Sequence, residues 1–195
     1  IISLVHFGRS GTGLLHSLID GHPEVSSLPS IYFSQFFDSS VWERLTKNGW
    51  DGIVDEFINT YPVLFDASSP DPVKGAGKSI PNLGRDEGMT SVGDNRDEIL
   101  RLDKSAFKNN LKQLLQSYSQ LDALELFRLI HRAYDQTLND NHRKSLLFYH
   151  IHNPEIYATS NFARLAPNAY WLMMVREPVQ NFESWARKDY LDNHY

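Results

Sequence analysis

IISLVHFGRSGTGLLHSLI, which spans residues 1–19, is the stretch that decides the fold of this chain. Residues 1–7 are mostly apolar and predict a buried strand that ends at Gly8. The glycines within Gly8–Gly13 predict a tight turn, and apolar residues after them recur at the three- and four-residue spacings of a helix. Gly21-His22-Pro23 ends that helix. These patterns predict a strand, a glycine-rich turn and a helix in succession.

The C-terminal part of the chain repeats this alternation. Ser145–His152 predicts a strand, and Pro154 is expected to open a helix over Glu155–Leu165. Ala169–Val175 is apolar throughout, as expected for a strand that is buried on both faces. A further helix is predicted from Val179 to about Leu191. Strands that alternate with helices predict an α/β fold, a parallel sheet flanked by helices.

The middle of the chain predicts helices and one long loop. Short helices are expected over Val41–Asn48 and Gly52–Tyr61, separated by Gly49. Residues 66–97 are rich in proline and glycine, and we expect them to form a long loop or insertion. The whole chain, 1–195, is interpreted as one domain without internal repeats.

Two more helices are predicted before residue 140. Asp103 is the expected N-cap of the first helix. The apolar side chains of this helix form one stripe along it; they are Phe107, Leu111, Leu114, Leu115 and Tyr118. The second runs from about Leu121 to Leu138, with Ser119 or Asp122 as its cap. The pair is interpreted as an αα-hairpin.

Composition narrows the class of protein. The 195 residues are 41% hydrophobic and contain no cysteine, which excludes disulfides, thiolate zinc sites and a cysteine nucleophile. The formal net charge of -5 argues against a nucleic-acid partner. The longest apolar run, Ala169–Val175, is too short to span a membrane, and no secretory leader is visible, so a cytoplasmic location is expected.

The two ends of the sequence predict that the chain is a fragment. The sequence opens directly on an apolar strand without an initiator Met and stops at Tyr195 in an aromatic stretch. We therefore expect a fragment whose fold continues on its C-terminal side.

The Gly8–Gly13 turn predicts an anion site. A helix N-terminus offers unpaired amide groups and the positive end of its dipole, and glycines let the anion approach the backbone. Arg9 adds a guanidinium that can bind two phosphate or sulfate oxygens together. The loop lacks the Gly-Lys-Ser/Thr ending of nucleoside-triphosphate P-loops, which argues against an ATPase or a kinase.

Two segments resemble sulfotransferases that use 3'-phosphoadenosine-5'-phosphosulfate (PAPS). Gly8–Leu15, followed by Asp20-Gly21-His22-Pro23, resembles the 5'-phosphosulfate loop of this family, in the form of its protein-tyrosine and carbohydrate branches. Met174–Trp185 is similar to the family's 3'-phosphate segment, in which a strand ends in Arg and a Ser lies eight residues later; Arg176 and Ser184 have that spacing. A P-loop-like sulfotransferase core is therefore expected.

The resemblance implies a set of site residues. It implies that PAPS and its product, adenosine 3',5'-bisphosphate, are held by two groups of residues; they are Arg9, Ser10, Gly11, Thr12, Gly13 and Leu14, together with Arg176 and Ser184. Arg9 is also expected to stabilise charge on the departing oxygen. Ser184 lies about two helical turns beyond the start of its helix, so it reaches the same anion only if the chain folds back there.

The resemblance also implies a general base. His150-Ile151-His152-Asn153-Pro154 resembles the Lys-x-His-x-Pro stretch of the cytosolic branch, in which the His is the base. His152 is the expected base, and His150 shares its strand face and is a weaker candidate for substrate contact. The protein-tyrosine branch uses a Glu shortly after the His-Pro instead, but Ser26–Ser30 contains no acid. No further ligands cluster near the histidines, so no metal is expected.

The acceptor is expected to be a carbohydrate or another small hydroxylated molecule. Aromatic residues of the segment 31–65 could line its cleft or fill the core, and the candidates are Tyr32, Phe33, Phe36, Phe37 and Trp42. Two alternatives remain at this point. One is another P-loop nucleotide enzyme, such as a small kinase. The other is a non-catalytic or truncated nucleotide-binding module.

Overall fold

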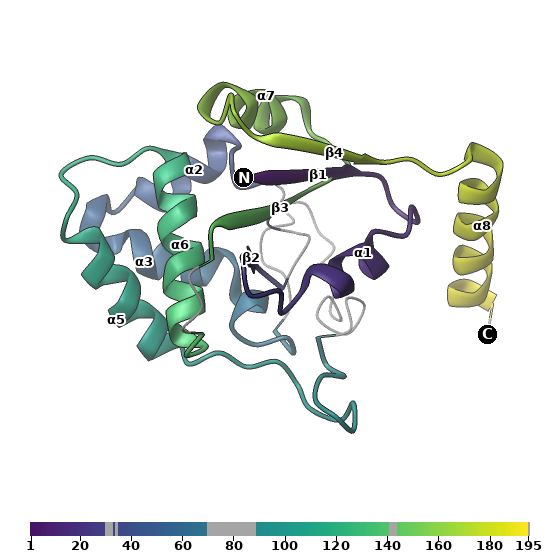
Figure 1. Ribbon diagram of the computed structural model, residues 1–195, viewed down its shortest axis with the longest axis horizontal. Coiled ribbons are helices and arrows are strands. Elements are labelled where there is room, and N and C mark those ends of the chain that lie inside the picture. The colour runs from purple at the N-terminus through teal and green to yellow at the C-terminus, as the bar shows by residue number, and fades with distance from the viewer. Residues whose placement is uncertain (30–32, 34, 70–88, 141–143, 195) are drawn as a thin grey trace.

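The computed structural model describes residues 1–29, 33, 35–69, 89–140 and 144–194, which form an α/β fold (Figure 1). Four strands make one parallel sheet in the order β2-β3-β1-β4; they are β1 (Ile2–His6), β2 (Val25–Ser27), β3 (Leu146–His152) and β4 (Tyr170–Met174). The helices of the described residues are α1 (Thr12–Ile19), α2 (Ser39–Thr46), α3 (Gly49–Thr60), α5 (Lys104–Leu115), α6 (Ala123–Thr137), α7 (Ile156–Leu165) and α8 (Pro178–His194), with a short 3₁₀ helix at Pro62–Leu64. The predicted parallel sheet flanked by helices is confirmed.

The central strand β1 sets the position of the site. It pairs in parallel with β3 on one side and with β4 on the other, and the register places His6 level with His152 and Met174. The carboxyl ends of these three strands therefore meet at one edge of the sheet, where ligands of open α/β folds bind. The chain leaves this edge through Gly8, Asn153 and Arg176.

The two faces of the sheet have different coverings. Side chains of Val5, Tyr149 and Ile151 join an aromatic core with α2, α3, α5 and α6, which Figure 1 shows grouped at one end of the molecule. The Phe127 ring of α6 lies 5.2 Å from the Tyr149 ring, centroid to centroid. The opposite face carries Leu4 and Phe148, which pack with residues of α1. This alternation follows from the two-residue period of a strand.

The capping predictions have clear outcomes. Asp103 caps α5, because its carboxylate accepts from the amides of Ser105 and Ala106 at 2.8 and 3.0 Å. Asp122, rather than Ser119, caps α6. Glu155 is the N-cap of α7, so the helix begins one residue later than predicted.

The predictions for residues 41–61 were right about two helices but wrong about their limits. The first, α2, begins at Ser39, because the Asp38 carboxylate caps it through the Ser40 amide. Gly49 does not separate the helices but is the first residue of α3, with φ at 71°. A glycine tolerates this left-handed backbone without steric cost.

The prediction for Ala169–Val175 was wrong in one respect. The strand forms as β4, but it lies at the edge of the sheet and is exposed rather than buried on both faces. Tyr170 and Met173 are 69% and 68% exposed. An apolar run predicts a strand, yet its place in the sheet depends on pairing partners that are distant in sequence. The three-residue strand β2 was not predicted, since so short a segment has no measurable periodicity.

The described parts of the 66–97 segment are irregular. Residues 70–88 lie outside the described residues, while 89–97 form turns with an antiparallel bridge between Val92 and Glu98. A second bridge joins Asp66 to Arg101. Among the helices that the structure describes, none has the length and apolar character needed to cross a bilayer.

Candidate nucleotide site

A cavity of about 760 Å³ opens at the carboxyl edge of the sheet. The glycine turn and α1 provide one part of its lining, namely Gly8, Arg9, Gly11, Thr12, Gly13, Leu14, His16, Ser17 and Asp20. Residues from other elements complete it, namely His6, Ser27, Pro29, Met89, Val92, Leu100, Tyr134, Leu138, His152, Arg176 and Ser184. The cavity has a size typical of sites for small ligands.

The glycine turn presents backbone amides to this cavity. Arg9 and Gly11 both have left-handed backbone, with φ at 64° and 88°, and they lie on either side of Ser10. Within the described part of the chain, the amides of Gly11, Thr12 and Gly13 donate to no protein acceptor. The first amides of a helix have no intrahelical acceptor, so this end of α1 can bind an anion.

The glycines of the turn differ in what a side chain at their position would meet. A Cβ at Gly8 would lie 2.6 Å from the Trp185 ring of α8, so glycine lets this helix pack against the turn. Gly11 is required by its positive φ. A Cβ at Gly13 would meet nothing within 4 Å. The space in front of Gly13 is therefore open to the cavity.

Arg9, Arg176 and Ser184 meet at this turn. Arg9 Nε donates to Ser184 Oγ at 3.0 Å, and Arg176 Nη1 donates to the Arg9 carbonyl at 3.0 Å. The chain folds back after β4, as the predicted role of Ser184 requires, and α8 stands at the end of the molecule away from the helical group (Figure 1). Two guanidinium groups thus lie beside the N-terminal end of α1.

The charges that line the cavity favour an anion near the turn. Asp20 is the one carboxylate among the lining residues that the structure describes, and it lies at the other end of α1. Its Oδ1 accepts from Ser27 Oγ at 3.1 Å. Arg9 and Arg176 therefore face the turn without a competing carboxylate among the described lining residues.

Four histidine rings form a hydrogen-bonded row under α1. His150 lies between His16, at 2.6 Å from His150 Nε2 to His16 Nδ1, and His6, at 3.2 Å from His150 Nδ1 to His6 Nε2. His6 Nδ1 lies 3.3 Å from His152 Nδ1. Asn153 Nδ2 lies 3.0 Å from His152 Nε2. The alternation of the strands places these side chains on the face that α1 covers.

Burial keeps the interior rings of this row neutral. It lowers the pKa of His150 to about 2, with further lowering by His16, His6 and His152. Burial and then His152 lower the pKa of His6 to about 4, against the opposing effect of the Phe7 carbonyl. Burial also lowers the pKa of His16, while Asp20 opposes that change. Among the described residues no three potential ligands converge on a metal position, and the rings follow one another in a row.

Several predicted site residues lie away from the cavity. Ser10 is buried, and its hydroxyl donates to the Phe7 carbonyl at 2.7 Å, so it closes the turn. His150 shares the face of His152 but is only 4% exposed and does not line the cavity, which corrects its prediction as a substrate contact. Phe33 packs within the aromatic core against Phe127, so the core interpretation holds for it. Tyr32 lies outside the described residues.

The other aromatic candidates belong to the core. Phe36 and Phe37 are buried there, and Trp42 packs against it. His22 lies in the turn after α1, where its Nδ1 accepts from the Glu24 amide at 3.1 Å.

His6, His16 and Asn153 contribute to the site but were not predicted. His6 lies on the first strand, level with His152 on the next, and only the strand order brings the two together. His16 comes from one turn further along α1 than Thr12. The one signal that could have indicated His6 is that it is, with Ser3, a polar residue in a largely apolar strand.

The chain was also compared with known proteins. A scan against protein-family models, a search of curated proteins and a search of solved structures each found no match.

Proposed function

We propose that this chain is a sulfotransferase that moves the sulfuryl group of PAPS to a hydroxyl or amine of a small-molecule or carbohydrate acceptor. The observation that carries the proposal is the meeting of Arg9, Arg176 and Ser184 at the N-terminal end of α1. These are the residues for which the resemblance implies contacts to the two ends of the nucleotide. An α/β fold does not by itself require such a meeting.

The binding of PAPS would use two groups of donors. The amides of Gly11, Thr12 and Gly13 and the Arg9 guanidinium would hold the 5'-phosphosulfate. Arg176 and Ser184 would hold the 3'-phosphate, and the Ser184 hydroxyl can donate to it while its oxygen accepts from Arg9. The open space in front of Gly13 suits an anion that lies close to the backbone.

The transfer itself forms one bond and breaks one. The acceptor oxygen bonds to sulfur while the bond from sulfur to the 5'-phosphate oxygen breaks, and that oxygen gains negative charge. Arg9 stabilises this charge and keeps its own proton. His152 takes the proton of the acceptor hydroxyl.

His152 can act in this way only after a local rearrangement. Its Nε2 lies 3.0 Å from the Asn153 amide nitrogen, and its Nδ1 faces His6. The Asn153 side chain must therefore turn away before His152 Nε2 can accept a proton. This observation favours a second candidate function, a nucleotide-binding module without turnover.

A magnesium-dependent kinase is supported less well. The turn has no lysine before its last Ser or Thr position, and the one described carboxylate of the cavity lining, Asp20, lies at the far end of α1. Nucleoside triphosphate sites normally hold their metal close to the phosphate turn.

The experiment that tests the proposal is titration calorimetry with adenosine 3',5'-bisphosphate, beside ADP with magnesium. We expect binding of the bisphosphate and at least tenfold weaker binding of ADP. A screen of hydroxylated acceptors with ³⁵S-labelled PAPS follows. Binding without transfer to any acceptor supports the second candidate, and preferential binding of ADP with magnesium contradicts the proposal.

A further inference from the structure

The row of histidines continues beyond the expected base into the protein. It starts at His152, passes through His6 and His150, and ends at His16, with successive nitrogen–nitrogen distances of 3.3, 3.2 and 2.6 Å. The rings come from β3, β1 and α1. His152 and His16 both line the cavity, whereas His150 lies beneath it.

The hydrogen bonds of Asn153 assign the protons in this row. The Gly8 amide donates to Asn153 Oδ1 at 3.3 Å, so the Asn153 amide nitrogen faces His152 and donates to its Nε2. A neutral imidazole has one N–H and one lone pair. His152 therefore carries its proton on Nδ1 and donates to His6 Nδ1.

The same reasoning passes along the row. In the order that starts at Asn153, His6 accepts at Nδ1 and donates from Nε2 to His150 Nδ1, while the Phe7 backbone also hydrogen-bonds the His6 ring. His150 then donates from Nε2 to His16 Nδ1, and His16 carries its proton on Nε2. Every ring accepts from one neighbour and donates to the next, and all donations run in one direction. A row with this order can pass a proton from ring to ring by short transfers, and no ring has to leave its position.

The end of the row at His16 suits the release of a proton. His16 is half-buried, and exposed Asp20 lies one helical turn further along α1, where its negative charge favours protonated His16. The inner rings His6 and His150 are buried, which disfavours a charge that stays on them. A charge is therefore not retained on the inner rings, and His16 is the half-buried end of the row away from the expected base.

We propose that His152, His6, His150 and His16 form a proton relay that carries the proton of the acceptor from the reaction centre to solvent. The proton of the acceptor hydroxyl goes to His152 Nε2, and the Nδ1 proton of His152 moves to His6 Nδ1. The Nε2 proton of His6 moves to His150 Nδ1, that of His150 moves to His16 Nδ1, and that of His16 goes to water. One proton enters the row and one leaves it. This inference rests on the proposed function, which supplies the proton.

The variant His150→Gln tests the relay. Glutamine can keep a donor and an acceptor in place but does not pass a proton as imidazole does. We expect kcat to fall about tenfold or more, within the range of general acid–base contributions. We also expect unchanged calorimetric affinity for adenosine 3',5'-bisphosphate and a larger solvent deuterium isotope effect on kcat. His22→Gln is the matched control, because His22 lies outside the row, and its kcat should equal that of the wild type.

The outcomes separate the relay from the function on which it rests. A wild type that transfers sulfuryl groups and a folded His150→Gln variant with the same kcat overturn the relay alone. A wild type that transfers none overturns the proposed function, and the relay with it. Nitrogen-15 NMR of the histidines reads the proton positions without turnover. Protons on Nδ1 of His152 and on Nε2 of the other three rings support the assignment, and any other pattern overturns it.

Discussion

Arg9 Nε donates a hydrogen bond to Ser184 Oγ at 3.0 Å, across 175 residues of sequence. Arg9 lies in the turn after β1 with φ at 64°, and Ser184 lies on α8, so the contact ties the last described helix to the first turn. The Trp185 ring packs over Gly8 beside it. Arg176, which precedes α8, donates to the Arg9 carbonyl at 3.0 Å, so both segments contact the turn.

Replacement of Arg176 with alanine should weaken binding of adenosine 3',5'-bisphosphate about tenfold or more, since hydrogen bonds to charged groups contribute about 1.5–3 kcal/mol. Binding of PAPS should weaken equally, because both ligands carry the 3'-phosphate. Calorimetry measures both affinities. Arg164→Ala is the control, because Arg164 is an exposed arginine in the last turn of α7 and does not line the cavity. Equal affinities for both variants would contradict the site.

Alanine at Gly11 and at Gly13 should have opposite effects on stability. Gly11→Ala should lower the free energy of unfolding by about 1 kcal/mol or more, because φ at 88° is strained for a residue with a Cβ. Gly13→Ala should raise it by about 0.5–1 kcal/mol, since Gly13 is helical and its Cβ would meet no atom within 4 Å. Urea unfolding measures both changes.

Gly13→Ala should nevertheless bind adenosine 3',5'-bisphosphate more weakly, because its methyl group would occupy the space in front of the amides. Calorimetry on the stabilised variant tests this point. An affinity equal to that of the wild type would place the anion elsewhere in the cavity.

The His152→Ala variant should lose turnover by a factor of about a hundred or more while it still binds adenosine 3',5'-bisphosphate. In the proposed function the imidazole takes the proton of the acceptor, whereas other residues hold the phosphates. Initial rates with labelled PAPS and calorimetry give the two values. Turnover close to that of the wild type would show that another residue is the base.

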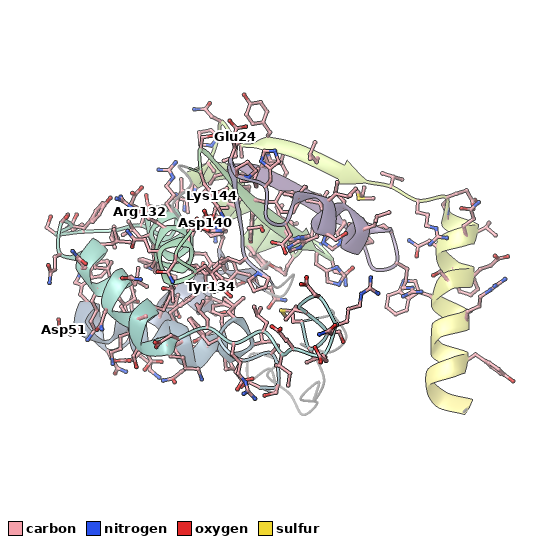
Figure 2. All side chains as sticks on the ribbon, turned by 60° about the horizontal axis from the view of Figure 1, so that its bottom comes forward. Glu24, Asp51, Arg132, Tyr134, Asp140 and Lys144 are labelled. Atoms are coloured by element: carbon pink, nitrogen blue, oxygen red, sulfur yellow. The ribbon has the colours of Figure 1, made fainter. Side chains whose placement is uncertain are left out.

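Three buried histidines predict a loss of stability in acid, and the pKa is lowered most in two of them, His131 and His150. His131 is fully buried, its Nδ1 lies 2.9 Å from Ser26 Oγ, and burial followed by Lys144 lowers its pKa to about 3. Lys144 itself contacts Asp135 and Asp140 at 2.9 and 2.8 Å, and Figure 2 labels Lys144 and Asp140. The pKa of His150 is lowered further, to about 2. In the unfolded chain both rings titrate near pH 6.5, so the unfolded state binds more protons below that pH.

The free energy of unfolding should therefore be independent of these groups above pH 6.5 and should fall as the pH drops below it. Each histidine contributes a slope of at most about 1.4 kcal/mol per pH unit. Urea unfolding between pH 7.5 and 4.5 measures the slope. The His131→Gln variant should show a shallower slope than the wild type, and an unchanged slope would contradict a neutral buried His131.

The local elements were predicted well from sequence because their signals are local. The strand, glycine turn and helix of residues 1–19 appear as β1, the turn and α1, and Asp103 caps α5 as its position before an apolar stripe predicts. Capping and periodicity depend on residues within one or two turns. Arg176 and Ser184 both bond to Arg9 of the turn. Their shared role in a site stays a prediction, which came from resemblance rather than from periodicity.

The tertiary structure decided what depends on contacts between distant segments. It places β4 at the sheet edge, so an apolar strand expected to be buried is exposed. It also places His6 level with His152, and His150 within hydrogen-bond distance of His16. Histidines that are far apart in the sequence therefore form one row. The sequence by itself determined most of the elements and the residue types of the Gly8–Gly13 turn. Which side chains meet there depends on strand order and register, and these are set by packing across the whole core.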